Sequence, residues 1–271
     1  MPVKFGIIPI IFIISVQLLL AQDKTDYVVL GNKYYDKGEF NKAIGYYSKA
    51  IELNIKNDNA YYFRASAKYN IGDLKGAVED YSKVVEIKPD NFLAYDARGI
   101  TKFNLGQYRG AIEDFSKSIS IVDDFSEAYN NRAFTKVMLK DYEGAISDYN
   151  KVFSIDSLNK AALYNRAVAK DESGDYSGAL EDFSKLIRLT FLNPENYFAR
   201  GNIYYKIKNY KAAVSDYDNA IKLKENYGEA YLKRGIAKQL LKNIKGAVAD
   251  WKKAKELNIP EAAKYLNRYC K

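Results

Sequence analysis

The sequence predicts an all-α fold, a solenoid built from helix–turn–helix repeats. Two observations predict it: the sequence repeats every 34 residues, and each repeat carries apolar residues at helical spacing on both sides of a break. Residues 38–44 align with residues 72–78 and 106–112, and the register holds from Lys24 to Glu261 without an insertion. The seven predicted repeats within residues 22–261 are 24–57, 58–91, 92–125, 126–159, 160–193, 194–227 and 228–261.

Three columns of the repeat explain how the helices pack. One column is always Ala, a second is always aromatic, and a third is always Gly or Ala. Where two helices cross closely, a larger side chain would separate the backbones, and the aromatic rings fill the remaining space. The three columns are Ala43, Ala77, Ala111, Ala145, Ala179, Ala213 and Ala247; Tyr47, Tyr81, Phe115, Tyr149, Phe183, Tyr217 and Trp251; and Gly31, Ala65, Gly99, Ala133, Ala167, Gly201 and Gly235.

The second repeat illustrates the expected local structure. Tyr61 and Ala65 lie four residues apart on a first helix, and Gly72 interrupts the pattern. Ala77 and Tyr81 restart the same spacing on a second helix. This pattern predicts two antiparallel helices joined by a tight turn. A single helix pair cannot bury both of its faces, so each repeat must stack on its neighbours.

These features resemble the tetratricopeptide repeat family over residues 24–261. The resemblance implies a right-handed α-solenoid with a groove on its concave side. Two columns depart from the family pattern. Proline near the end of the second helix occurs only as Pro89. The large side chain usual late in the first helix is present as Tyr34 and Tyr204, but five other repeats have Lys68, Lys102, Lys136, Lys170 and Lys238.

An arginine column and an aspartate column recur in every repeat except the first, which has Leu30 and Tyr46 in their places. If each arginine pairs with the aspartate of its own repeat, no arginine or aspartate of the two columns is left without a partner. Arg64 and Asp80 are each eight residues from the turn at Gly72, so they lie level in a hairpin. We therefore predict structural ion pairs inside the repeats; the alternative is that both columns face water. The predicted pairs are Arg64–Asp80, Arg98–Asp114, Arg132–Asp148, Arg166–Asp182, Arg200–Asp216 and Arg234–Asp250.

The first 21 residues differ from the repeats. Residues 5–21 are apolar apart from Ser15 and Gln17, and polar sequence begins at Gln22. A helix of this length is shorter than the hydrocarbon core of a bilayer. Residues 1–21 are therefore predicted to be a secretory signal peptide cleaved after Ala21. An uncleaved N-terminal anchor is the alternative. The expected location is the periplasm, the cell surface or the medium of a bacterium.

The other end of the chain, residues 262–271, is predicted to form a capping helix. Tyr265, Leu266 and Tyr269 give this helix one apolar face, as covering the final repeat requires. Cys270 is the only cysteine in the chain, so an internal disulfide cannot form.

The first helices also carry a stripe of side chains that the packing columns do not use, here called the groove stripe. It comprises Val28, Asn32, Tyr35, Tyr62, Ser66, Tyr69, Asp96, Ile100, Phe103, Asn130, Phe134, Val137, Tyr164, Val168, Asp171, Phe198, Asn202, Tyr205, Leu232, Ile236 and Gln239. The family resemblance implies that these positions line a groove that receives peptide segments. Part of the stripe is expected to pack between first helices instead, particularly Ile100, Val168 and Ile236. The predicted peptide-binding residues are Tyr35, Tyr62, Tyr69, Phe103, Asn130, Phe134, Val137, Tyr164, Phe198, Asn202 and Tyr205.

Composition argues against catalysis. The chain has no histidine, and its sequence shows no Gly-rich phosphate loop, metal-ligand cluster or nucleophile motif. We therefore predict no catalytic residue, no cofactor, no metal and no small-molecule substrate. The groove stripe also lacks the converging Lys and Arg side chains that a clamp on a C-terminal carboxylate needs, which disfavours a cytosolic co-chaperone.

The predicted function is a non-enzymatic, exported scaffold that binds a protein or peptide. One alternative is binding of single-stranded nucleic acid by the helical repeats, and another is a membrane-anchored assembly factor. The net charge of +8 is spread along the chain without a basic run. This dilution disfavours the nucleic-acid alternative.

Overall fold

The computed structural model describes residues 27–269. The predicted leader at residues 1–21 and the cysteine at position 270 lie outside the described residues. Those described form helices and turns, with no strand among them. They fall into two compact units, residues 27–135 and 136–269. Within residues 27–269, no helix combines the length and hydrophobicity that crossing a bilayer requires.

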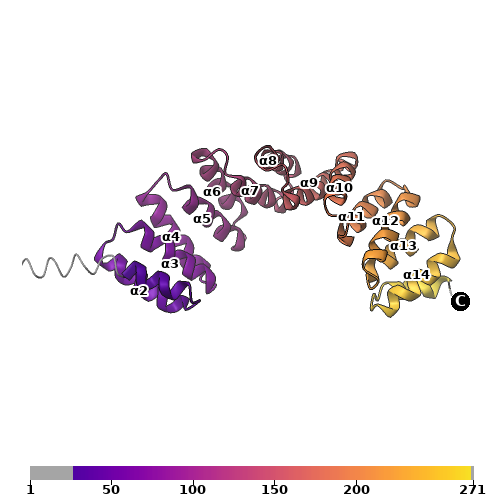
Figure 1. Ribbon diagram of the computed structural model, residues 1–271, viewed down its shortest axis with the longest axis horizontal. Coiled ribbons are helices and arrows are strands. Elements are labelled where there is room, and N and C mark those ends of the chain that lie inside the picture. The colour runs from indigo at the N-terminus through magenta and orange to yellow at the C-terminus, as the bar shows by residue number, and fades with distance from the viewer. Residues whose placement is uncertain (1–26, 270–271) are drawn as a thin grey trace, which may run out of the picture. The chain divides into compact units, whose positions relative to one another are not determined.

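The first unit is a succession of helices, coloured indigo to magenta in Figure 1. Residues 27–35 are helical and precede α2 (Phe40–Leu53). From α2 to α6, each helix packs against the next one in the chain. The helices that follow α2 are α3 (Asp58–Asn70), α4 (Leu74–Ile87), α5 (Phe92–Asn104), α6 (Tyr108–Ile121) and α7 (Ser126–Met138), whose last residues belong to the second unit.

The second unit continues the same pattern. Each of its helices from α8 onward packs against the next, and α11 also contacts α13. Odd-numbered helices up to α13 are the first helices of repeats, and even-numbered helices are the second helices. The helices are α8 (Tyr142–Ile155), α9 (Lys160–Ser173), α10 (Tyr176–Leu189), α11 (Pro194–Lys206), α12 (Tyr210–Leu223), α13 (Gly228–Leu240), α14 (Ile244–Glu256) and α15 (Ala262–Tyr269).

The turn between the two helices of a repeat contains a residue in the left-handed backbone conformation, with positive φ. Gly72 supplies it with φ of +84°, a conformation that glycine adopts without a Cβ clash. In three repeats a lysine takes this conformation instead, at Lys140, Lys208 and Lys242. The next helix is then capped by a side chain: Asp73 accepts a hydrogen bond from the backbone N–H of Gly76 at 3.0 Å.

The aromatic column fills the space between paired helices. Its seven rings are all buried, and the Gly or Ala column lies directly against them. A Cβ atom added at Gly99 would lie 2.7 Å from Cε1 of Phe115, and one added at Gly235 would lie 2.5 Å from Nε1 of Trp251. Close ring-to-backbone packing therefore explains why these positions admit only the smallest residues.

The final repeat is covered by α15. The ring of Tyr265 stacks on Trp251 with centroids 5.0 Å apart, and Tyr269 approaches the same indole at 5.5 Å. Leu266 packs against the same cluster. The apolar face of this short helix thus shields the core that the last pair, α13 and α14, would otherwise leave open.

Candidate functional site

The arginine and aspartate columns pair across the hairpins. Arg64 donates from Nε and Nη2 to the two carboxylate oxygens of Asp80, at 2.8 and 2.7 Å. The aspartate is only 4% exposed, so the pair is structural. Arg132 and Asp148 belong to different units, and their pairing stays a prediction. Equivalent two-point pairs join Arg98–Asp114, Arg166–Asp182, Arg200–Asp216 and Arg234–Asp250.

The lysines that depart from the family pattern approach the same carboxylates. Nζ of Lys68 lies 2.8 Å from Oδ2 of Asp80, so this carboxylate has two cationic partners. The sixth repeat has Tyr204 in place of the lysine. Two cations offset part of the desolvation of a nearly buried carboxylate, and the carboxylates in these clusters are engaged inside their hairpins rather than open to a ligand. The other lysine pairs are Lys102–Asp114, Lys136–Asp148, Lys170–Asp182 and Lys238–Asp250.

The arginines also reach the preceding repeat, a contact that sequence analysis missed. Nη1 of Arg64 donates to the hydroxyl of Ser48 at 3.0 Å, which joins α3 to α2. One guanidinium group therefore holds its own hairpin together and links it to its neighbour. The corresponding pairs are Arg98–Ser82, Arg132–Ser116, Arg166–Asn150, Arg200–Ser184 and Arg234–Asp218.

In the first unit, the predicted peptide-binding residues remain accessible. Phe134 is 43% exposed, and its ring centroid lies 5.5 Å from that of Phe103. The hydroxyl of Tyr69 accepts a hydrogen bond from Asn104 at 2.7 Å, which joins α3 to α5. Such bonds fix the tyrosine rings while leaving part of their surface free. The partly buried members of this unit are Tyr35, Tyr62, Tyr69, Phe103 and Asn130.

In the second unit, the stripe is also accessible, and two of its polar groups are engaged with other side chains. Tyr164 is 37% exposed, whereas Asn202 accepts a 2.8 Å hydrogen bond from the core residue Tyr217. Asp171 forms an ion pair of 2.7 Å with Lys206. Asn202 therefore supports the core as well as lining the stripe. The partly buried predicted residues here are Val137, Phe198, Asn202 and Tyr205.

The stripe positions expected to pack between first helices are partly buried. Val168 packs against the core cluster of the second unit that contains Leu163, and Ile236 packs against the cluster that contains Trp251. Leu232 is buried outright, at 3% exposure. The stripe is thus partly core and partly surface, and its two most exposed residues, Phe134 and Tyr164, are both aromatic.

Asp96, on α5, is a stripe residue in an unusual environment. It is 9% exposed, and Asn131 on α7 donates a hydrogen bond of 3.2 Å to its Oδ1. Burial raises the pKa of Asp96 to about 6, with an added effect from the negative charge of Glu127. The sequence pattern puts Asp96 in the stripe, but Asp96 is not among the predicted peptide-binding residues, because the burial of a single acid is not visible in the pattern.

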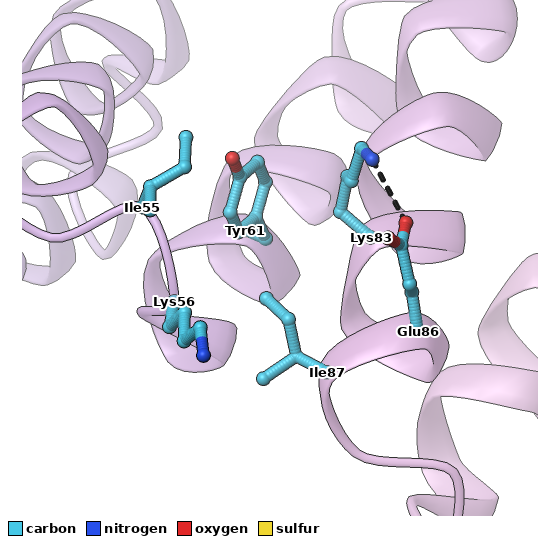
Figure 2. A pocket seen from close by; sticks show the side chains of 6 residues that line it. All are labelled: Ile55, Lys56, Tyr61, Lys83, Glu86 and Ile87. Atoms are coloured by element: carbon cyan, nitrogen blue, oxygen red, sulfur yellow. Dashed lines mark hydrogen bonds and ion pairs between the residues drawn. The ribbon is translucent and has the colours of Figure 1, made fainter.

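A pocket is present in the first unit and is lined by residues outside the groove stripe. Figure 2 shows Ile55, from the loop after α2, with Tyr61 on α3 and Ile87 on α4 around this pocket. The pocket has a volume of about 400 Å³. Lys83 and Glu86 line it and form an ion pair of 2.8 Å with each other. None of these residues belongs to the stripe, and no repeat pattern singled out this place.

The six column aspartates are spread one to a repeat, and each has an ion pair. Over residues 27–269, no group of three or more Cys, Asp or Glu side chains is arranged to hold a metal ion. Partly exposed rings and amides held on rigid helices are suited to contacting an extended or helical segment.

Comparisons with known proteins agree with this architecture. A family profile described as TPR repeat matches residues 31–72 and 201–242, and one described as Tetratricopeptide repeat matches residues 58–91 and 126–157. Comparison with curated proteins gives no match.

Solved structures resemble the chain at low sequence identity. A tetratricopeptide repeat protein from Parabacteroides merdae is 20% identical, with a TM-score of 0.66 over 92% of this chain and 98% of that one. The C-terminal part of a TPR repeat-containing protein from Cytophaga hutchinsonii is 15% identical, with a TM-score of 0.77 over 88% and 98%. YrrB, described as a TPR protein with an unusual peptide-binding site, is 19% identical, with a TM-score of 0.61 over 68% and 95%. These likenesses and the family profiles lead to one conclusion: the chain is a member of the tetratricopeptide repeat family, with the all-α solenoid fold of that family.

Proposed function

We propose that this protein is a non-enzymatic scaffold that binds a protein or peptide segment along the groove stripe. The observation that supports this most strongly is the accessibility of the predicted aromatic residues, none of which is buried. Large rings on a rigid support bind with little loss of side-chain entropy, because their positions are already fixed. The hydrogen bond from Asn104 to Tyr69, at 2.7 Å, is an example of such fixing.

A polypeptide ligand is favoured over a nucleic acid by the charges of the stripe. The stripe contains two acidic residues, Asp96 and Asp171, and no Lys or Arg. A phosphate backbone needs Lys or Arg side chains along its path, and binding depends on them strongly. A filter-binding assay at low salt is expected to retain no single-stranded RNA or DNA; retention would favour the nucleic-acid alternative.

The proposal is tested by selecting peptides from a random 12-residue display library on the full chain. We expect binders, and the Tyr69→Ala/Phe103→Ala double variant is expected to lose at least tenfold in affinity for them, since each ring supplies a large contact area. Ile55→Ala is the matched control, because Ile55 is 68% exposed but lines the separate pocket. If the double variant binds the peptides as tightly as the wild type, or if only Ile55→Ala loses affinity, the binding site does not lie on the stripe.

Export belongs to the proposal and rests on the apolar segment at residues 5–21. A secreted scaffold would lose residues 1–21, whereas an anchored one would keep them. Mass spectrometry of the native N-terminus, together with cell fractionation, tests this. A chain that begins at Met1 and is found in the cytoplasm would contradict export.

A further inference from the structure

Asp96 differs from the aspartates that stabilise the repeats. Asp80 is paired with both Arg64 and Lys68. Among the described residues, Asn131 on α7 donates a hydrogen bond to Asp96, and Tyr62 on α3 and Glu127 on α7 interact with it electrostatically; none of these is a cation. Asn131 donates to Oδ1. Oδ2 receives no hydrogen bond from residues 27–269, and it is not one of the fully enclosed side-chain atoms without a partner, so it is open to solvent.

The fold does not require a charge at this position. The equivalent residues of the other repeats are all uncharged: Val28, Tyr62, Asn130, Tyr164, Phe198 and Leu232. A buried carboxylate without a cationic partner destabilises a protein, because desolvation is not offset. Asp96 therefore lowers the stability of a repeat that could pack without it, and a cation supplied from outside would offset that cost.

We propose that Asp96 receives a lysine or arginine side chain of the bound segment, so that the groove stripe of the first unit selects basic peptides. The inference rests on the proposed function of the stripe. The ammonium or guanidinium group would donate to the free carboxylate oxygen and lie beside the ring of Tyr62, whose face attracts cations. The carboxylate of Glu127 adds to the negative potential at this place.

The second unit provides a matched control. Asp171 is also a stripe aspartate, but Nζ of Lys206 lies 2.7 Å from its Oδ2. Its charge is already neutralised, so Asp171→Asn is not expected to change the selectivity for basic peptides. The net charge of +8 repels basic peptides from the protein as a whole, so any preference for them must arise locally.

The test uses the same 12-residue library with the full chain, Asp96→Asn and Asp171→Asn. We expect the wild type and Asp171→Asn to enrich peptides with Lys or Arg at one position, and Asp96→Asn to select aromatic or apolar peptides without that enrichment. For a selected peptide labelled with fluorescein, Lys→Gln is expected to weaken binding about tenfold on the wild type and to have no effect on Asp96→Asn.

Each other outcome has a definite meaning. Peptides that bind the stripe without a basic preference would reject the role of Asp96 and leave the proposed function standing. A lysine preference that survives in Asp96→Asn would also reject it. Failure to select any peptide would reject both the inference and the proposed function.

Discussion

The hydroxyl group of Tyr217 donates a 2.8 Å hydrogen bond to the amide oxygen of Asn202. This bond connects a fully buried ring of the second helix to a groove-stripe residue of the first helix. Where the aromatic column lacks a phenol, the residue 15 positions earlier is apolar. The polar combinations are Asn32–Tyr47, Ser66–Tyr81 and Asn202–Tyr217, and the apolar ones are Ile100–Phe115, Val168–Phe183 and Ile236–Trp251.

Tyr149 is the exception to this rule and gives the first prediction. The residue 15 positions before it is Phe134. Its hydroxyl is buried without a hydrogen bond of normal geometry to any described residue, although Asn165 is close enough to influence its pKa. We expect Tyr149→Phe to leave stability unchanged or raise it, and Tyr217→Phe to lower the free energy of unfolding by about 1 kcal/mol. Urea denaturation measures both, and an equal loss in the two variants would contradict the rule.

The ion-pair clusters give a second prediction. Asp80 is paired with Arg64 and Lys68, whereas Asp216 is paired with Arg200 and has Tyr204 where the lysine would be. Asp80→Asn is expected to lower the free energy of unfolding by about 3 kcal/mol, because it strands two partly buried cations.

Two companion variants separate this explanation from a general loss of packing. Asp216→Asn should cost less than Asp80→Asn, because one cation is stranded instead of two. Adding Lys68→Met to Asp80→Asn should restore part of the lost stability. If the double variant is no more stable than Asp80→Asn alone, Lys68 does not contribute as proposed here.

The sequence predicts part of the Arg64–Lys68–Asp80 cluster but not all of it. The arginine and aspartate columns predicted pairs inside the hairpins because both lie eight residues from the turn. The sequence marks the lysines only as departures from the family pattern, since their position usually holds a large packing residue. Only the structure shows that the long aliphatic stem of Lys68 spans the hairpin and brings Nζ within 2.8 Å of Asp80.

The groove stripe was likewise predictable from sequence only in part. Helical spacing predicted which residues share a face, and the rings of Tyr69 and Phe103 are accessible there. Spacing does not reveal hydrogen-bond partners across a hairpin, so Asn202 was assigned to ligand binding alone. Burial depends on neighbouring helices as well as on position, which is why Asp96 is nearly buried while Asn130, at the equivalent position, is partly exposed.

Close packing of the first helix against the aromatic column gives a third prediction. A Cβ at Gly235 would lie 2.5 Å from Nε1 of Trp251 and 3.2 Å from the backbone oxygen of Ala247. Gly235→Ala is therefore expected to destabilise the protein by about 1–3 kcal/mol. Gly45→Ala is the control, because a Cβ there meets no atom within 4 Å, and removing a glycine from helix α2 should stabilise by about 0.5–1 kcal/mol. Thermal melts that rank the two variants the other way would contradict this packing.

The pH dependence of stability gives a fourth prediction. The pKa of Asp96 is raised from 3.8 to about 6 by burial, so the folded state holds its proton more tightly than the unfolded state. As pH rises through this interval the unfolded state ionises first, and the contribution of Asp96 to stability falls. Asn131 is hydrogen-bonded to this carboxyl group, Tyr62 and Glu127 interact with it electrostatically, and none of the three supplies a positive charge.

Asp96→Asn removes this effect. It should be more stable than the wild type by up to about 3 kcal/mol at about pH 7, and the difference should shrink towards zero at about pH 4. Urea denaturation of both proteins at the two pH values checks the sign. A difference that does not change with pH would show that the carboxyl group titrates normally.

The central claim is that ligands bind on the groove stripe, and mapping a bound peptide tests it most directly. Hydroxyl-radical footprinting of side chains, with and without a peptide selected on the full chain, reports which side chains become covered. The account predicts protection of Tyr69 and Phe103, with no change at Ile55, an exposed residue of the separate pocket. Protection of Ile55 with Tyr69 and Phe103 left as reactive as in the free protein would contradict it.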